Sequence, residues 1–165
     1  MMKNTLLAFL IVGLFTGCLK GNDNNNNFTC SYNDCAVVAP ATEIDAVQAY
    51  LSANSITATR HCSGLFYVID NAGTGATPTA CSDVAVTYEG KLTNGNTFDK
   101  AENPVPFNLS RVINGFKNGV PLIKAGGKIR LYIPPSLGYG PNPTPDGSIP
   151  GNSILIFDVT LVAVR

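Results

Sequence analysis

The chain has 165 residues, in which 11 lysines and arginines balance 11 aspartates and glutamates. This length suits one domain with appendages better than two full domains. Zero formal charge with 13% charged residues provides no basic surface for nucleic acid, and 45% hydrophobic content excludes wholesale disorder.

Residues 1–17 have the pattern of a secretory signal peptide. Lys3 precedes an apolar stretch, 6–15, that is shorter than the about 20 residues a helix needs to cross a bilayer. Residues 15–18 (Phe-Thr-Gly-Cys) resemble the lipobox of bacterial lipoproteins, in which the cysteine becomes the acylated first residue. We therefore expect an exported bacterial lipoprotein with its lipid on Cys18, facing the periplasm or anchored at the outer membrane. The alternatives are a buried N-terminal helix or a membrane anchor.

A lipidated, asparagine-rich spacer is expected over residues 18–40. It contains the run Asn24–Asn27 and has no apolar periodicity, and asparagine favours turns over helices and strands. We expect this segment to hold the folded domain away from the membrane.

Four cysteines remain after the one in the lipobox is set aside. An even number in an exported chain predicts disulfide bonds, and four cysteines allow three pairings. Proximity in the sequence favours Cys30 with Cys35 and Cys62 with Cys81. The alternative is a zinc site with a nitrogen from His61, although an oxidising compartment disfavours it. As a residue without such a role, His61 is expected at the surface.

Residues 41–60 are expected to form a helical extension. Ile44, Val47 and Leu51 fall on one face of a helix. Thr42 is expected to cap its N-terminus, with acidic residues in the first turn, where the helix dipole favours them. We expect this helix to pack on the domain rather than to bind a partner.

From residue 61 onward the pattern changes to strands. The strand candidates are 65–69, 84–90, 97–99, 105–109, 128–133 and 154–164. Asn94-Gly95 predicts a hairpin because both residues accept positive φ. The segment 112–120 has helical spacing, and its glycines limit it to about two turns. Residues 61–165 therefore predict an α+β domain in which an antiparallel sheet packs against one short helix.

The inventory of reactive residues is small. The sequence has no pair of histidines at metal-binding helical spacing, no glycine-rich phosphate loop after a strand and no Gly-x-Ser-x-Gly motif. Its one histidine adjoins a cysteine that is expected to be oxidised, which leaves little for nucleophilic catalysis. Aromatic and aliphatic residues are plentiful. This composition favours binding, or a catalysis that needs no nucleophile, metal or cofactor.

Six motifs in one order resemble the FKBP-type peptidyl-prolyl cis/trans isomerases. The motifs are VTYEG at 86–90, NGNTFD at 94–99, VINGF at 112–116, LGYG at 137–140, SIP at 148–150 and LIFDV at 155–159. The likeness covers roughly residues 64–165. The family fold, a curved antiparallel sheet wrapped around a short helix, agrees with the pattern of strands and helix. The resemblance implies an enzyme that isomerises X–Pro bonds of exported polypeptides.

The resemblance also implies an apolar pocket. The residues expected to carry catalysis are Tyr88, Phe98, Asp99, Ile113, Phe116, Tyr139 and Phe157. Those expected to bind substrate beside them are Val105, Phe107, Val112 and Ile149. Phe116 would be the floor, and the backbone N–H of Ile113 would hold a substrate carbonyl. Asp99 would accept a hydrogen bond that orients Tyr88 or the substrate backbone.

Two positions depart from the family's pattern. The floor is usually tryptophan and here is Phe116, and a usually aromatic wall position corresponds to Val105. Both changes keep the pocket apolar but enlarge or soften it. Two other functions therefore stay open, a proline-binding chaperone with little turnover and a surface interaction module. The substrates implied by the resemblance are proline-containing polypeptides, and we expect the protein to be a monomer.

Overall fold

The computed structural model describes residues 30–165, and the expected signal peptide and Cys18 lie outside the described residues. The strands are β1 (Thr59–Arg60), β2 (Phe66–Asn71), β3 (Asp83–Leu92), β4 (Thr97–Asn108), β5 (Lys128–Ile133) and β6 (Leu155–Val164). The helices are α1 (Ala41–Ala53) and α2 (Asn114–Gly119). In residues 30–165 no helix combines the length and the apolar character needed to cross a membrane.

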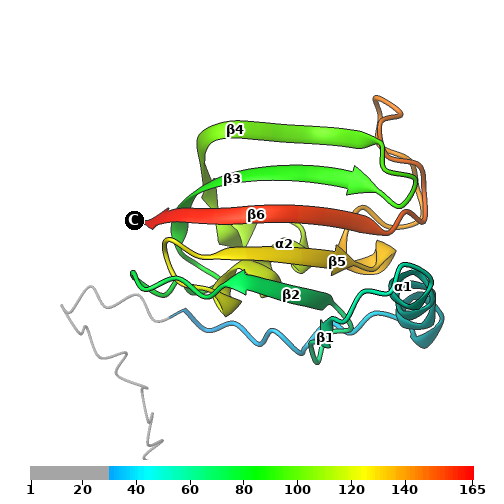
Figure 1. Cartoon of the computed structure of the whole chain (residues 1–165), viewed down its shortest axis with the longest axis horizontal. Coiled ribbons are helices and arrows are strands. Elements are labelled where there is room, and N and C mark those ends of the chain that lie inside the picture. The colour runs from blue at the N-terminus through cyan, green and yellow to red at the C-terminus, as the bar shows by residue number, and fades with distance from the viewer. Residues whose placement is uncertain (1–29) are drawn as a thin grey trace, which may run out of the picture.

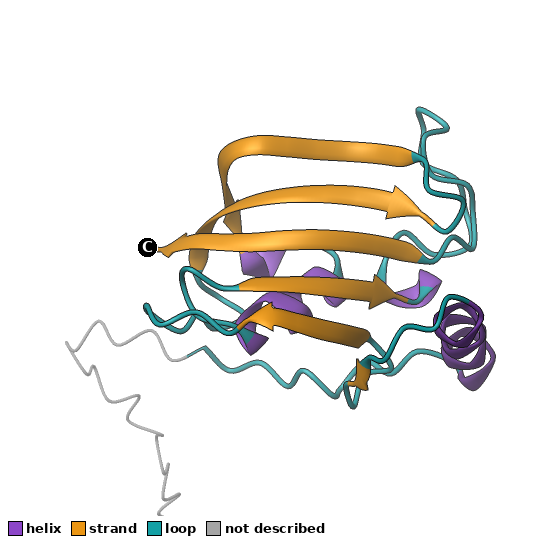
Figure 2. Ribbon diagram, viewed as in Figure 1, coloured by secondary structure: helices purple, strands orange, loops and turns teal. Residues whose placement is uncertain are grey.

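The six strands form one antiparallel sheet in the order β1-β2-β5-β6-β3-β4. Figure 2 shows α2 against one face of this sheet and α1 beside one end of it. The last strand, β6, lies between β5 and β3, and its alternate residues Leu155, Phe157, Val159 and Leu161 are buried. The arrangement confirms the predicted α+β fold.

The two pieces predicted at 97–99 and 105–109 form one strand, β4, with an irregularity inside it. Ala101 pairs with Tyr88 of β3 and Val105 pairs with Val86, so residues 102–104 all lie opposite Thr87. Such extra residues bend a strand. Figure 1 shows the second half of β4 turning toward the face that carries α2.

The start of α1 differs from the prediction. The helix begins at Ala41 with Pro40 at its N-cap, and no side chain caps it, so the expectation that Thr42 is the cap was wrong. The carbonyl of Pro40 accepts the first helical hydrogen bonds, which leaves Thr42 inside the first turn. Glu43 in that turn accepts a hydrogen bond from the backbone N–H of Ser136 at 2.8 Å and so fastens α1 to the domain.

Both disulfide bonds join residues 30–39, called the strap below, to loops of the domain. The pairs are Cys30–Cys81 and Cys35–Cys62, with Cα–Cα distances of 5.7 and 5.5 Å. The predicted pairing of sequence neighbours was therefore wrong. The strap passes across two different loops, so each of its cysteines bonds to the loop that it meets rather than to its own neighbour in sequence.

The buried face of α1 allows a prediction of how much its packing contributes to the free energy of unfolding. Leu51 is 1% exposed, whereas Gln48 of the same helix is exposed to solvent. We expect Leu51→Ala to lower the free energy of unfolding by about 2–5 kcal/mol, because the cavity left behind adds to the lost burial. Gln48→Ala, on the same helix, should change it by about 0.5 kcal/mol or less. Urea denaturation measures both, and equal effects of the two variants would show that α1 is not packed as described.

Candidate functional site

The short helix α2 lies unusually close to β5. Gly115 and Gly119 are four residues apart and face this strand, and a Cβ on either one would collide with Ile133 or Leu131. At Gly119 the added atom would fall 2.5 Å from the side chain of Leu131. Residues with side chains would push the helix outward. The two glycines therefore set the distance of α2 from the sheet, and with it the position of Phe116.

Phe116 is the centre of an aromatic cluster. Its ring centroid lies 5.5 Å from that of Phe157, 6.1 Å from that of Phe107 and 6.3 Å from that of Tyr88. The three interplanar angles are 79–81°, the edge-to-face geometry that aromatic rings prefer. Phe116 itself is 4% exposed. The rings from α2, β3, β4 and β6 thus support one another around this residue.

A second aromatic contact depends on a glycine. The ring centroids of Phe98 and Phe157 are 5.4 Å apart in an edge-to-face arrangement. A Cβ on Gly90 would lie 2.6 Å from the Phe98 ring and 2.8 Å from the Phe157 ring. The position between the rings on β3 therefore requires glycine.

These rings border a cavity of about 340 Å³. Its lining residues are Tyr88, Asp99, Phe107, Arg111, Val112, Ile113, Phe116, Tyr139 and Phe157. A neighbouring cavity of about 440 Å³ shares Asp99 and Tyr139 with it and is also lined by Phe98 and Ile149. The structure thus brings ten of the eleven expected site residues together around two adjoining cavities.

The structure corrects the placement of Val105. This residue pairs with Val86 and lines neither of the two cavities. Phe107, also expected to bind substrate, supplies the aromatic ring from this half of β4, and its ring centroid lies 5.8 Å from that of Tyr88. The irregularity at 102–104 shifts the second half of β4 and brings Phe107 to this place. Of the two departures from the family's pattern, the phenylalanine at the floor, Phe116, is then the one that remains.

Sequence reasoning missed Arg111. Arg111 is the last residue of the 3-10 helix Leu109–Arg111 and is exposed. It lines the cavity beside Val112 and Ile113. Hydrophobic periodicity carries no signal for so short a turn. Its position immediately before Val112 and Ile113, two expected site residues, is the one indication that the sequence offers.

One carboxylate at the cavity, that of Asp99, holds the hydroxyl of Tyr88. Asp99 accepts a hydrogen bond from the Tyr88 hydroxyl at 2.6 Å through Oδ2 and one from the backbone N–H of Lys100 at 2.8 Å through Oδ1. Burial, and then the hydrogen bond to Asp99, raises the pKa of Tyr88 above its usual value. Burial, and then the charges of Asp99 and Asp146, raises the pKa of Tyr139. Both phenols are therefore protonated at neutral pH and can donate hydrogen bonds.

His61 is not the surface residue that was expected. Its side chain is 10% exposed and lies 2.9 Å from Ser63 Oγ and 3.2 Å from Asp34 Oδ2. The sulfurs of Cys35 and Cys62 beside it are bonded to each other, so in this structure they are not thiolate ligands for a zinc ion.

The link between Asp99 and Tyr88 can be tested by titration. We expect Asp99→Asn to lower the pKa of Tyr88, because the neutral amide no longer opposes a negative charge on the phenol. Ultraviolet absorbance during alkaline titration measures the change, and the same titration of Tyr88→Phe identifies this phenol among the six. Asp83→Asn is the control, because Asp83 lies on β3, the strand of Tyr88, but does not contact the Tyr88 hydroxyl. This variant should leave the pKa of Tyr88 unchanged. A titration of Asp99→Asn identical to that of the unchanged chain would contradict the assignment.

Comparisons with known proteins place the site in context. A family model described as "FKBP-type peptidyl-prolyl cis-trans isomerase" matches residues 75–162. The chain is 46% identical over 107 residues to the protein named "FKBP-type peptidyl-prolyl cis-trans isomerase FkpA" in Buchnera aphidicola subsp. Schizaphis graminum, a match that covers 62% of this chain and 42% of that protein. It is 43% identical over 106 residues to the protein of the same name in Escherichia coli K12, covering 62% and 38%. The match therefore spans less than half the length of these relatives.

Two solved structures are similar along most of the chain. The crystal structure of a peptidyl-prolyl cis-trans isomerase from Pseudomonas syringae pv. tomato has a TM-score of 0.67 and 29% identity, and the match covers 77% of this chain and 97% of that one. The crystal structure of FkpA from Escherichia coli has a TM-score of 0.67 and 37% identity, covering 76% and 60%.

Proposed function

The chain belongs to the family of FKBP-type peptidyl-prolyl cis-trans isomerases, and from this premise we propose that it isomerises X–Pro bonds of exported polypeptides in the aromatic cavity. One observation carries the proposal. The rings of Tyr88, Phe107, Phe116 and Phe157 line a single cavity together with a carboxylate and a second phenol. This set can hold a proline ring but offers no thiol or imidazole for a covalent step.

The reaction suits an apolar site. An X–Pro bond rotates slowly because amide resonance creates a barrier near 20 kcal/mol, which corresponds to about 10⁻² per second. The twisted transition state loses this resonance, and its carbonyl loses part of its dipole. An apolar cavity disfavours the polar, planar ground state more than the twisted state. A rate of about 10³ per second requires the site to remove roughly 7 kcal/mol from the barrier.

The polar groups then act as hydrogen-bonding partners of the substrate backbone. Ile113 is the N-cap residue of α2, so its carbonyl serves the helix while its N–H lies outside the helical hydrogen bonds. We infer that this N–H holds a substrate carbonyl. Asp99 fixes the hydroxyl of Tyr88 at the cavity edge, and neither group needs to transfer a proton.

Substitutions in the cavity test this function. We expect Asp99→Ala and Phe98→Ala each to lower kcat/KM by about tenfold, which corresponds to a loss of about 1.4 kcal/mol of transition-state stabilisation. The assay is the refolding of a protein whose slow phase is limited by proline isomerisation. Lys100→Ala is the matched control, because Lys100 is exposed, follows Asp99 on β4 and pairs with Glu102 at 2.6 Å. Equal activity of all three variants would show that the reaction does not use this cavity.

We also propose that the protein is an exported lipoprotein with its lipid on Cys18. Two disulfide bonds support export, since they persist in oxidising compartments. The disulfide bonds fasten residues 30–39 to the domain, so we restrict the proposed spacer to residues 18–29. We propose in addition that the protein acts as a monomer, since the cavity lining is complete within one chain and needs no residue from a second copy.

Mass spectrometry of the mature N-terminal peptide tests the lipid. We expect the peptide to begin at Cys18 and to carry the additional mass of acyl chains, which bind the protein stably to membranes. Cys18→Ser should abolish this mass and release the protein from the membrane fraction, while its two disulfide bonds stay intact. A mature chain that begins elsewhere, or an unmodified Cys18, would refute the anchor and leave the proposed isomerase activity unaffected.

A further inference from the structure

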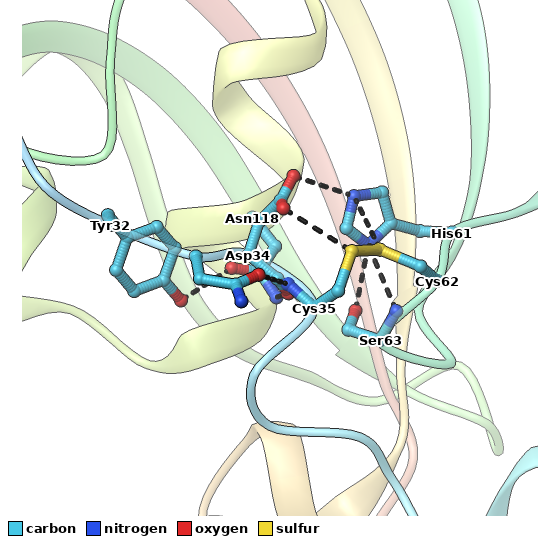
Figure 3. The surroundings of a disulfide bond; sticks show 8 residues. Tyr32, Asp34, Cys35, His61, Cys62, Ser63 and Asn118 are labelled. Carbon is cyan, nitrogen blue, oxygen red and sulfur yellow. Dashed lines mark hydrogen bonds and ion pairs between the residues drawn. A yellow bond between two sulfur atoms is a disulfide. The ribbon is translucent and has the colours of Figure 1, made fainter.

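A second group of reactive side chains lies on the strap side of α2, around the Cys35–Cys62 disulfide bond (Figure 3). We propose that this bond is a thiol–disulfide exchange site, which accepts thiols of unfolded, cysteine-containing polypeptides. His61 gives a proton to the sulfur that leaves, Cys62, and Asp34 positions the His61 ring. The inference does not depend on the proposed isomerase activity, since none of these residues lines the aromatic cavity.

The two disulfide bonds differ in accessibility. Cys35 and Cys62 are both exposed, whereas Cys30 and Cys81 are half-buried. An attacking thiolate must approach a sulfur along the S–S axis, so accessibility limits the rate of exchange. This difference makes Cys35–Cys62 the site that an external thiol reaches first, and it makes Cys30–Cys81 an internal control.

The His61 ring lies beside the sulfur of Cys62. Its Nδ1 and Nε2 atoms are 3.6 and 3.8 Å from Cys62 Sγ. The backbone N–H of Ser63 points to Nδ1 at 3.2 Å, which favours the neutral ring with its proton on Nε2, where Asp34 Oδ2 accepts it at 3.2 Å. Nδ1 is then the basic nitrogen, and after it takes a proton the hydroxyl of Ser63, 2.9 Å away, can accept from it.

The charges around the bond decide which sulfur leaves. A thiolate leaves more readily beside a positive charge, and less readily beside a negative one. The protonated His61 ring would lie beside Cys62, whereas Asp34 Oδ1 lies 3.3 Å from Cys35 Sγ. Attack is therefore expected at Cys35, with Cys62 as the leaving thiolate.

The exchange balances in two steps. The client thiol releases its proton to water, and its thiolate bonds to Cys35 Sγ while the Cys35–Cys62 bond breaks. Cys62 leaves as a thiolate and takes a proton from the protonated His61 ring beside it, and the ring regains a proton from water. A second client thiol then attacks the client sulfur of the mixed disulfide, and Cys35 leaves and takes the second proton. The client loses two electrons and gains a disulfide bond, and Cys35 and Cys62 gain the two electrons and become thiols.

The strap stays in place when this bond opens. On one side of Cys35 the strap is held by Cys30–Cys81, and on the other the backbone N–H of Ala39 donates to the carbonyl of Ser63 at 2.9 Å. Asn118 of α2 is 3% exposed and donates to the carbonyl of Asp34 at 3.1 Å. These contacts keep the two thiols near each other, so that exchange with another disulfide, which is reduced in the process, can restore the bond.

The test begins with the oxidised full chain and reduced glutathione. Free thiols are trapped at intervals with an alkylating reagent and assigned by peptide mass spectrometry. We expect Cys35 and Cys62 to open at least about ten times faster than Cys30 and Cys81. We expect His61→Gln to slow the opening of Cys35–Cys62 by about threefold to tenfold and to leave Cys30–Cys81 unchanged in the same molecules. Equal opening rates of the two bonds, or an unchanged rate in His61→Gln, would overturn the proposal.

A second arm replaces glutathione with a reduced, unstructured peptide that carries two cysteines. We expect one equivalent of peptide to become oxidised as Cys35–Cys62 is reduced. The double variant Cys30→Ser, Cys81→Ser should retain this exchange, and the double variant Cys35→Ser, Cys62→Ser should lose it. Opening by glutathione without oxidation of the peptide would overturn the assignment of polypeptide clients. The refolding assay on the same samples distinguishes this result from a failure of the isomerase function.

Discussion

The close approach of α2 to β5 is the constraint on which both sites depend. Gly115 and Gly119 allow this approach, and successive residues of the six-residue helix then point to different parts of the molecule. Phe116 faces the sheet and joins the aromatic rings that border the cavity. Asn118 contacts the strap, where it accepts a hydrogen bond from the Tyr32 hydroxyl and donates one to the backbone carbonyl of Asp34. One short helix thus fixes the cavity floor and the segment that carries Cys35.

The sequence was sufficient to predict those elements whose signal is local. The strand predicted at 128–133 has these bounds in the structure. Apolar residues alternate with Lys128 and Arg130 at its start and follow a glycine pair, and such a pattern indicates a strand without knowledge of its neighbours. The aromatic residues of the site were found through motifs that keep a fixed order along the chain. Their meeting in space follows once the family fold is known, which explains why ten expected residues gather around the two cavities.

The predictions that failed concern relations between distant segments. Cys30 and Cys81 are 51 positions apart, and nothing local indicates that the strap crosses the loop before β3. The exchange of Val105 for Phe107 has a similar origin, because the irregularity at 102–104 depends on how β4 pairs with β3. Glu43 was expected to act on its own helix, and it also binds the N–H of Ser136, which is 93 positions away.

The Cys30–Cys81 bond determines how the domain would respond to a force that pulls on the chain ahead of Cys30. Tension applied ahead of Cys30 passes through this covalent link to Cys81 and on to β3, the strand between β4 and β6. Helix α1 and the hairpin of β1 and β2 lie off this load path. Such a force would therefore act first on the strands with the most extensive pairing, and α1 and the β1–β2 hairpin would not carry it.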